Sequence, residues 1–169
     1  VFHNLLQRGF PGPIYPVNPV ARSVQSVRAY ASIEEVPDAI DLAVIVVPTA
    51  AVLEAVRACA RAGVRGLVVI TAGFAELGAE GKALQDHLVE IVRAHGMKML
   101  GPNCLGLLDT DPAILLDATF APTWPPAGPV AIASQSGAVG LAILDHAREL
   151  GIGIRQFAST GNKADVSGN

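Results

Sequence analysis

The stretch 42-LAVIVVPTAAVLEAVRACARAGVRGLVVI-70 decides the fold that we expect for this chain. Its opening aliphatic run is typical of a strand that is covered on both faces. The next residues carry Val52, Val56 and Ala60 at helical spacing, and Gly63 ends that helix before a second aliphatic run begins. Strand, helix and strand in this order predict parallel strands joined by a right-handed crossover.

The same alternation continues on both sides of this stretch. We expect a helix from Glu80 to His95, a strand from Lys98 to Leu100, and an earlier short strand from Ile14 to Val17. A strand at 130–133, a helix at 138–150 and a strand at 153–158 predict one further β-α-β unit. The sequence therefore predicts an α/β protein with a parallel, doubly wound sheet.

The segment from Ala121 to Pro129 interrupts this pattern with four prolines in nine residues. Such a segment is typical of a domain boundary. We therefore predict a first domain at 1–121, a linker at 122–129 and the first unit of a second domain at 130–169. Because the chain lacks a starting Met and stops soon after a strand, we expect it to be a fragment of a longer protein.

The composition is that of a globular protein, with 51% hydrophobic and 16% charged residues. A net charge of −3 and scattered Lys and Arg argue against a nucleic-acid partner. The apolar runs are far shorter than the roughly 20 residues of a membrane span. Cys59 and Cys104 form no CxxC pair, so we predict no disulfide framework and no metal site, as in a cytoplasmic protein.

Four predicted strands lead into turns of small, proline or hydroxyl residues, and in a parallel sheet these turns share the carboxyl edge where nucleotides bind. Any one of them has the composition of an ordinary structural turn. An Asp or Glu after the second strand would favour NAD, whereas the neutral Asn18 turn favours a ligand with a phosphate on its ribose, such as coenzyme A or NADP. The candidate residues are Pro16, Val17, Asn18, Val47, Pro48, Thr49, Thr71, Gly73, Gly101, Pro102, Asn103 and Cys104.

A second kind of turn, Ser134-Gln-Ser-Gly-Ala138, joins a strand to the start of a helix. Backbone amides and the positive end of the helix dipole make such a start an anion site, so we predict that Ser134, Ser136, Gly137 and Ala138 bind phosphate. The alternative is a tight turn that Ser caps. No Lys follows the glycine, which argues against a P-loop.

The four histidines, at positions 3, 87, 95 and 146, have no partners at metal-ligand or catalytic-triad spacing. We therefore predict no catalytic residue within this chain.

The segments YPVNP, VIVVPTAAV, VVITAGFAE, LGPNCLG, IASQSGAVG and STGNKAD occur in this order. In this order and spacing they resemble NDP-forming acyl-CoA synthetases, the relatives of the succinyl-CoA synthetase alpha subunit. The likeness covers nearly the whole chain. It implies a Rossmann-like CoA-binding domain without its first strand, followed by the start of a flavodoxin-like domain.

The resemblance also implies roles for the candidate residues. Those at 16–18 and 47–49 would lie beside the nucleotide end of coenzyme A, and Thr71, Gly73 and the turn at 101–104 would flank its thioester end. The turn at 134–138 would receive the phosphate of a phosphohistidine, which is expected beyond Asn169. The family's glycine-rich loop for the CoA phosphates has no counterpart in this sequence.

The reaction implied by the resemblance converts acyl-CoA, ADP and phosphate to acid, CoA and ATP. An ATP-grasp domain or subunit outside this chain would hold ATP or ADP with Mg²⁺, and an oligomer is expected. Two alternatives stay open: a CoA-binding regulatory module of a protein lysine acetyltransferase, and an NADP-dependent oxidoreductase domain.

Overall fold

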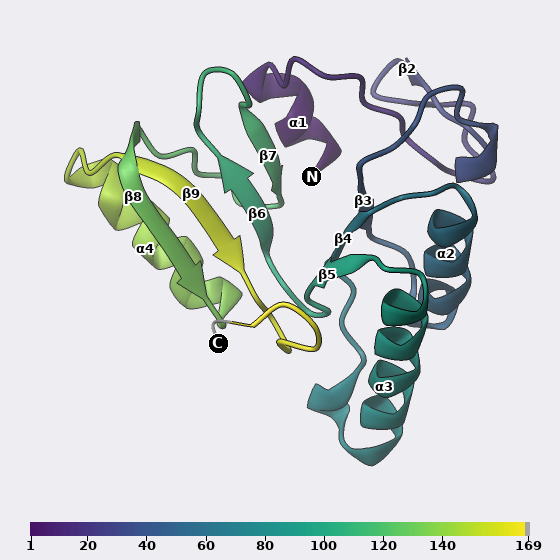
Figure 1. Ribbon diagram of the computed structural model, residues 1–169. Helices are drawn as coiled ribbons and strands as arrows, with labels where there is room; N and C mark the ends of the chain where they lie inside the picture. The colour runs from purple at the N-terminus through teal and green to yellow at the C-terminus, as the bar shows by residue number, and fades with distance from the viewer. Residues whose placement is uncertain (168–169) are drawn as a thin grey trace.

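The computed structural model describes residues 1–167 and contains two main sheets, which Figure 1 shows side by side. The first sheet is parallel, in the order β3-β4-β5, with β3 (Leu42–Ile45), β4 (Gly66–Val69) and β5 (Lys98–Leu100). Helices α2 (Thr49–Arg61) and α3 (Ala79–Ala94) connect these strands and lie together on one face. The predicted β-α-β-α-β order is confirmed.

Aliphatic residues from the first sheet and its two helices form the main hydrophobic core. The helical spacing of Val52 and Val56 on α2 turns both side chains toward the sheet, where they are fully buried. Leu88 and Val92 do the same on α3, and Phe74, ahead of α3, fills the space beside them. Burial of one such aliphatic side chain contributes about 2 kcal/mol, so this face holds the helices in place.

The second sheet is mixed, in the order β7-β6-β9-β8, and α4 (Gly137–Glu149) packs on it. Its strands are β6 (Gly106–Asp109), β7 (Leu116–Thr119), β8 (Ala127–Ser134) and β9 (Ile154–Ser159). Strands β8 and β9 are parallel around α4, as predicted, whereas β6 runs antiparallel to both β7 and β9. Strands β6 and β7 were missed by the sequence analysis.

The two sheets meet at the face of the first sheet that α2 and α3 leave open. Val68, Leu100 and Cys104 are buried there and pack against Leu107 and Ala158 of the second sheet. Thus helices cover one face of the parallel sheet, and the second sheet covers part of the other. The predicted domain boundaries stay a prediction, although β6, which precedes the proline-rich segment, pairs with β9, which follows it.

The first 40 residues contain short elements: α1 (Phe2–Arg8), a hairpin of β1 (Ser23–Val24) and β2 (Val27–Arg28), and the 3-10 turn η1 (Ile33–Glu35). The predicted strand from Ile14 to Val17 is wrong, because only Val17 makes a single bridge, with Tyr30. Prolines at positions 11, 13, 16 and 19 lack the amide protons that a continuous ladder needs. A second 3-10 turn, η2 (Ala75–Leu77), precedes α3.

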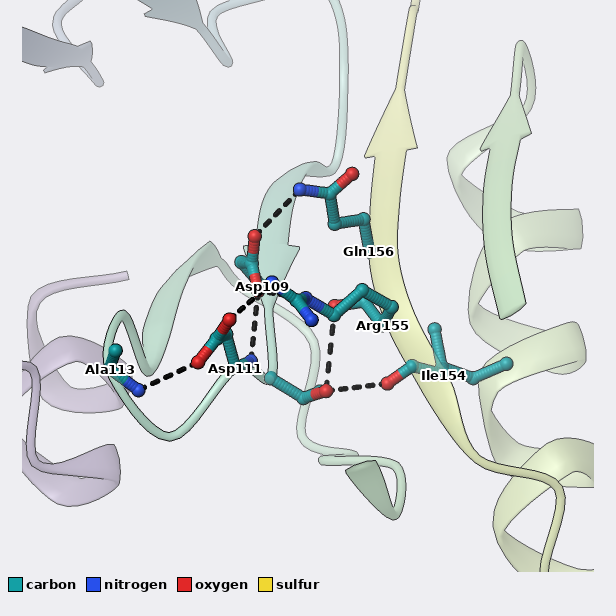
Figure 2. A network of polar contacts seen from close by, with 7 residues as sticks. Asp109, Asp111, Ala113, Ile154, Arg155 and Gln156 are labelled. Carbon is teal, nitrogen blue, oxygen red and sulfur yellow. Dashed lines mark hydrogen bonds and ion pairs between the residues drawn. The ribbon is translucent and has the colours of Figure 1, made fainter. Parts of the chain in front are cut away.

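A polar network joins β6 to the start of β9 (Figure 2). The Asp109 carboxylate is almost fully buried and accepts hydrogen bonds from Gln156 (2.7 Å) and from the Asp111 amide (2.9 Å). Arg155 pairs with Asp109 at 3.3 Å and also with Asp111. Burial raises the pKa of Asp109, but the bonds from Gln156, the Asp111 amide and Arg155 outweigh it and lower that pKa overall.

Among the helices of residues 1–167, none has the length and apolar composition that crossing a membrane requires.

Candidate functional site

The turns that follow β3 and β4 are tied together by threonine side chains. The Thr71 hydroxyl donates to the Val47 carbonyl at 2.7 Å, and the Thr49 hydroxyl donates to the Ala72 carbonyl at 2.8 Å. The turn after β5 joins them, since the Asn103 amide donates to the Thr71 carbonyl at 3.0 Å. The structure therefore brings the predicted residues at 47–49, 71–73 and 101–104 to one edge of the parallel sheet.

The backbone at Gly101 requires a glycine. Its φ is 99°, and a Cβ at this position would lie 2.4 Å from the Val69 carbonyl oxygen. The peptide bond to Pro102 is cis, Asn103 has a φ of 57°, and the Asn103 residue is exposed. Such a closely packed turn holds its polar groups in a fixed position.

The Cys104 thiol lies beneath this turn and packs against the sheet. It is buried and donates to the Val69 carbonyl at 3.3 Å. Burial raises the pKa of Cys104 to about 11, which outweighs the opposing hydrogen bond from the Gly106 backbone. The group is therefore a neutral thiol at physiological pH and not a nucleophile.

The predicted residues at 16–18 form a separate group. The Asn18 amide donates to the Tyr30 carbonyl at 2.8 Å, and the Tyr30 amide donates to the Pro16 carbonyl at 3.0 Å. The Asn18 side-chain oxygen accepts from the amides of Val20 and Ala21, both at 2.9 Å. Its carboxamide thus shapes its own turn, and the role of these residues toward a nucleotide stays a prediction.

The predicted phosphate turn is the start of α4. Ser136 is the N-cap, and its hydroxyl accepts from the Val139 amide at 3.3 Å. The Ser134 hydroxyl donates to the Ser136 carbonyl at 2.8 Å and so stabilises the turn. The first amides of a helix have no partner within it, so Gly137 and Ala138 can donate to an anion.

The start of α4 lies next to the turn after β5. A Cβ on Gly137 would lie 3.2 Å from the Leu105 Cβ, and the Leu105 amide donates to the Ser159 hydroxyl at 3.0 Å. The segment after β9 continues this junction, since the Thr160 amide donates to the Ser134 carbonyl at 2.8 Å. The two predicted sites, at 101–104 and at 134–138, therefore meet at the carboxyl ends of β5, β8 and β9.

Four residues for which no role was predicted make side-chain hydrogen bonds at this junction: Glu76, Gln85, Gln135 and Asn162. The adjacent Gly161 and Asn162 are typical of a turn. This pair of residues predicts the turn but not the hydrogen-bond partners of Asn162, because Gln85 lies 77 residues away in the sequence.

Histidines do not contribute to the junction. On α3, the His95 ring bonds to the Ile91 carbonyl, and His87 contacts Arg57 of α2. On α4, His146 pairs with Glu149. No cluster of metal-binding side chains occurs among residues 1–167. The start of α4 offers backbone donors at a helix N-terminus, which suit an anionic ligand.

Two protein families match the chain. Residues 1–110 match the family described as CoA binding domain, and residues 127–169 match the family described as succinyl-CoA ligase like flavodoxin domain. The resemblance drawn from the sequence motifs is thereby confirmed.

Curated relatives match along nearly the whole chain. The Archaeoglobus fulgidus acetate–CoA ligase [ADP-forming] I is 45% identical over 157 residues, which cover 93% of this chain and 23% of the relative. The alpha subunit of Pyrococcus furiosus acetate–CoA ligase [ADP-forming] II is 46% identical, over 98% of this chain and 35% of the relative. This chain thus spans about a quarter of the first protein and about a third of the second.

A solved structure also matches along nearly the whole chain. The dinucleotide-forming acetyl-coenzyme A synthetase 1 of Ca. Korarchaeum cryptofilum, in complex with phosphate and ADP, superimposes with a TM-score of 0.93 at 43% identity. The match covers 99% of this chain and 35% of that one. The α/β fold expected from the sequence is therefore confirmed.

Proposed function

This chain belongs to the CoA binding domain family, and from that premise we propose that it is the CoA-binding portion of an ADP-forming acyl-CoA ligase. The observation that carries the proposal is the junction between the turn at 101–104 and the N-terminus of α4. One side suits a thioester and the other suits a phosphate, which are the two groups that such a ligase must bring together.

In the proposed reaction, phosphate attacks the acyl-CoA thioester and releases CoA. The acyl phosphate then passes its phosphoryl group to a histidine and releases the carboxylate. The phosphohistidine passes the phosphoryl group to ADP, which forms ATP and frees the histidine, and every step is reversible. The amides of Gly137 and Ala138 would stabilise the charge on the phosphoryl group. We propose that the histidine comes from outside this chain, as does an ATP-grasp domain or subunit that holds ADP with Mg²⁺.

The site residues follow from the same proposal. Residues 16–18 and 47–49 would contact the nucleotide end of coenzyme A, and Thr71, Gly73 and the turn at 101–104 would contact its thioester end. The structure supports this arrangement for the turns at 47–49, 71–73 and 101–104, which are joined by hydrogen bonds. We also propose a cytoplasmic assembly of subunits, because relatives include separate alpha subunits.

The experiment is an assay of the full-length protein for ATP formation from acetyl-CoA, ADP and phosphate, together with calorimetric titration by CoA, dephospho-CoA and NADP. We expect ATP formation and tight binding of CoA. CoA binding without ATP formation would support a regulatory CoA-binding module instead. Tight binding of NADP without CoA binding would overturn the proposal in favour of an oxidoreductase.

The phosphate site has its own test in the variant Ala138→Asp. A carboxylate at the start of α4 repels a phosphate, so we expect kcat/KM for phosphate to fall by about 10-fold or more. Ala83→Asp is the matched control, because it adds the same charge at an exposed position of α3. Equal effects of the two variants would contradict a phosphate site at α4.

A further inference from the structure

The segment 159-STGNKAD-165 follows β9, and its Asn162 makes four hydrogen bonds to three other parts of the chain. Its amide donates to the Pro102 carbonyl at 2.9 Å. Its side-chain nitrogen donates to Glu76 (2.5 Å) and to Gln85 (2.9 Å), and its side-chain oxygen accepts from Asn103 at 3.3 Å. Asn162 therefore joins η2, α3 and the turn after β5.

The partners of Asn162 require a donor at this position. Burial raises the pKa of Glu76, but hydrogen bonds from Asn162 and from the Gly73 amide lower it overall, so Glu76 is an ionised acceptor. The Glu76 oxygen that faces away from Asn162 accepts from Gly73 at 2.5 Å. Gln85 is buried and turns its side-chain oxygen to Asn162. A side chain without an N–H would leave the buried Gln85 oxygen unsatisfied and would remove one of the two hydrogen bonds of Glu76.

The same segment is fastened to the N-terminal side of α4. The Thr160 amide donates to the Ser134 carbonyl at 2.8 Å, and the Gln135 side chain donates to the Gly161 carbonyl at 3.1 Å. Residues 160–162 thus have one set of bonds to the phosphate turn and another to the turn at 101–104. Their position sets how far apart these two turns lie.

We propose that Asn162 is a positioning residue that fixes the turn at 101–104 relative to the N-terminus of α4. The inference rests on the proposed function, in which a thioester held at the first meets a phosphate held at the second. Reacting groups must approach to about 3–3.5 Å, so a small displacement slows the chemical step. CoA binding depends on several turns and is affected much less.

The test uses Asn162→Asp in the full-length protein. This change keeps the size of the side chain and the oxygen that faces Asn103, but it sets an acceptor against Glu76 and Gln85. The additional change Glu76→Gln returns a donor to the contact while keeping an oxygen for the Gly73 amide. Gln25→Glu, in the exposed turn between β1 and β2, is the control for added charge.

We expect Asn162→Asp to lower kcat about 10-fold or more, to change the Kd of CoA by less than about 3-fold, and to recover most of its kcat with Glu76→Gln. Amide exchange at 101–105 and 160–164 is expected to quicken in the single variant and to slow again in the double variant. An unchanged kcat, an equal loss of CoA affinity, or no recovery in the double variant would overturn the proposal.

Amide exchange separates this inference from the proposed function. If the unsubstituted protein forms no ATP, the proposed function fails, and the exchange pattern then decides the positioning role alone. Faster exchange at both segments, reversed by Glu76→Gln, would support the role of Asn162. Unchanged exchange would exclude it.

Discussion

The two ends of β9 carry polar networks of opposite character. At its start, Arg155 forms ion pairs with Asp109 and Asp111, and Gln156 completes the coordination of Asp109 (Figure 2). At its end, Ser159 and the nearby Asn162 bond to neutral amides, carbonyls and one carboxylate. One strand thus connects a charged cluster to a mostly neutral one.

This difference separates a network that holds the fold from one that suits a ligand. Arg155 pairs with both carboxylates at the start of β9, and the buried Asp109 accepts its hydrogen bonds from Gln156 and the Asp111 amide. Near the end of β9, the first backbone amides of α4 have no hydrogen-bond partner within the helix, and the helix dipole places a partial positive charge there. A functional site for anions is therefore expected at the end of β9 and not at its start.

The largest effect should come from Gly161→Ala, at the end of β9. Gly161 has a φ of 54°, and a Cβ there would lie 2.2 Å from the Pro102 carbonyl oxygen and 2.5 Å from that of Asn103. Backbone strain and this overlap together should lower the free energy of unfolding by about 3 kcal/mol. Chemical denaturation measures the loss.

The matched control is Gly151→Ala, just before β9. Gly151 has a similar φ of 67°, but a Cβ there meets nothing within 4 Å. We expect it to cost about 1 kcal/mol, from backbone strain alone. Equal losses for the two variants would mean that the segment after β9 does not rest on the turn at 101–104.

A smaller effect is expected from Arg155→Ala, at the start of β9. The change removes a cation from the buried Asp109, which still keeps its bonds from Gln156 and the Asp111 amide. Because Arg155 is half-exposed, we expect a loss of only about 1.5 kcal/mol in the free energy of unfolding. CoA affinity should stay the same, since the change lies at the opposite end of the strand.

Arg65→Ala is the control for this prediction, because Arg65 and Asp41 form an ion pair in which both side chains are about four-fifths exposed. We expect no measurable change in stability from it. A loss of CoA affinity in Arg155→Ala would contradict the division of roles between the two ends of β9.

The sequence predicted well the helices and strands whose own residue spacing is enough to identify them. Helical spacing in α2 and α3 and the aliphatic runs of β3 and β4 need no knowledge of distant partners. Strands β6 and β7 were missed because Leu116-Asp-Ala-Thr119 has no such pattern, and its buried Asp117 argues against a core strand. Tertiary contacts decide its conformation.

The candidate site divides in the same way. Turns at the carboxyl ends of parallel strands meet by geometry, so the cluster at 47–49, 71–73 and 101–104 was predictable. The contacts of Asn162 were not, because they depend on how the second sheet packs against the first. The proposed ligand, coenzyme A, was inferred from the resemblance of the motifs. Only the structure shows which residues join the turn at 101–104 to the turn at 134–138.

The smallest effect concerns two carboxylates on the neighbouring strands β6 and β7, whose pKa values shift in opposite directions. The pKa of Asp109 is lowered, whereas burial raises that of Asp117, and its contacts with Thr119, Arg8 and Asn4 offset this only in part. The fully buried Asp117 lies 3.6 Å from Arg8, and one of its oxygens has no hydrogen bond within residues 1–167.

These directions fix the sign of the pH dependence. A raised pKa means that the contribution of Asp117 to stability is fully present below its unfolded pKa of about 4 and is lost as the pH rises through the folded pKa. Asp117→Asn should therefore match or exceed the unsubstituted protein at pH 7, by no more than about 1 kcal/mol, and lose that advantage at pH 4.

Asp109→Asn should behave in the opposite way, because a lowered pKa means that Asp109 stabilises the fold above its unfolded pKa and ceases to do so as the pH falls through the folded one. Urea denaturation of both variants at pH 7 and pH 4 makes the comparison. If Asp117→Asn destabilised the protein more at pH 7 than at pH 4, the ion pair with Arg8 would outweigh the burial of the charge. The Asp117 carboxylate of β7 would then stabilise the fold through its ion pair with Arg8 of α1, as Arg155 and Asp109 do at the start of β9. The cost of burying its charge would be the smaller of the two effects.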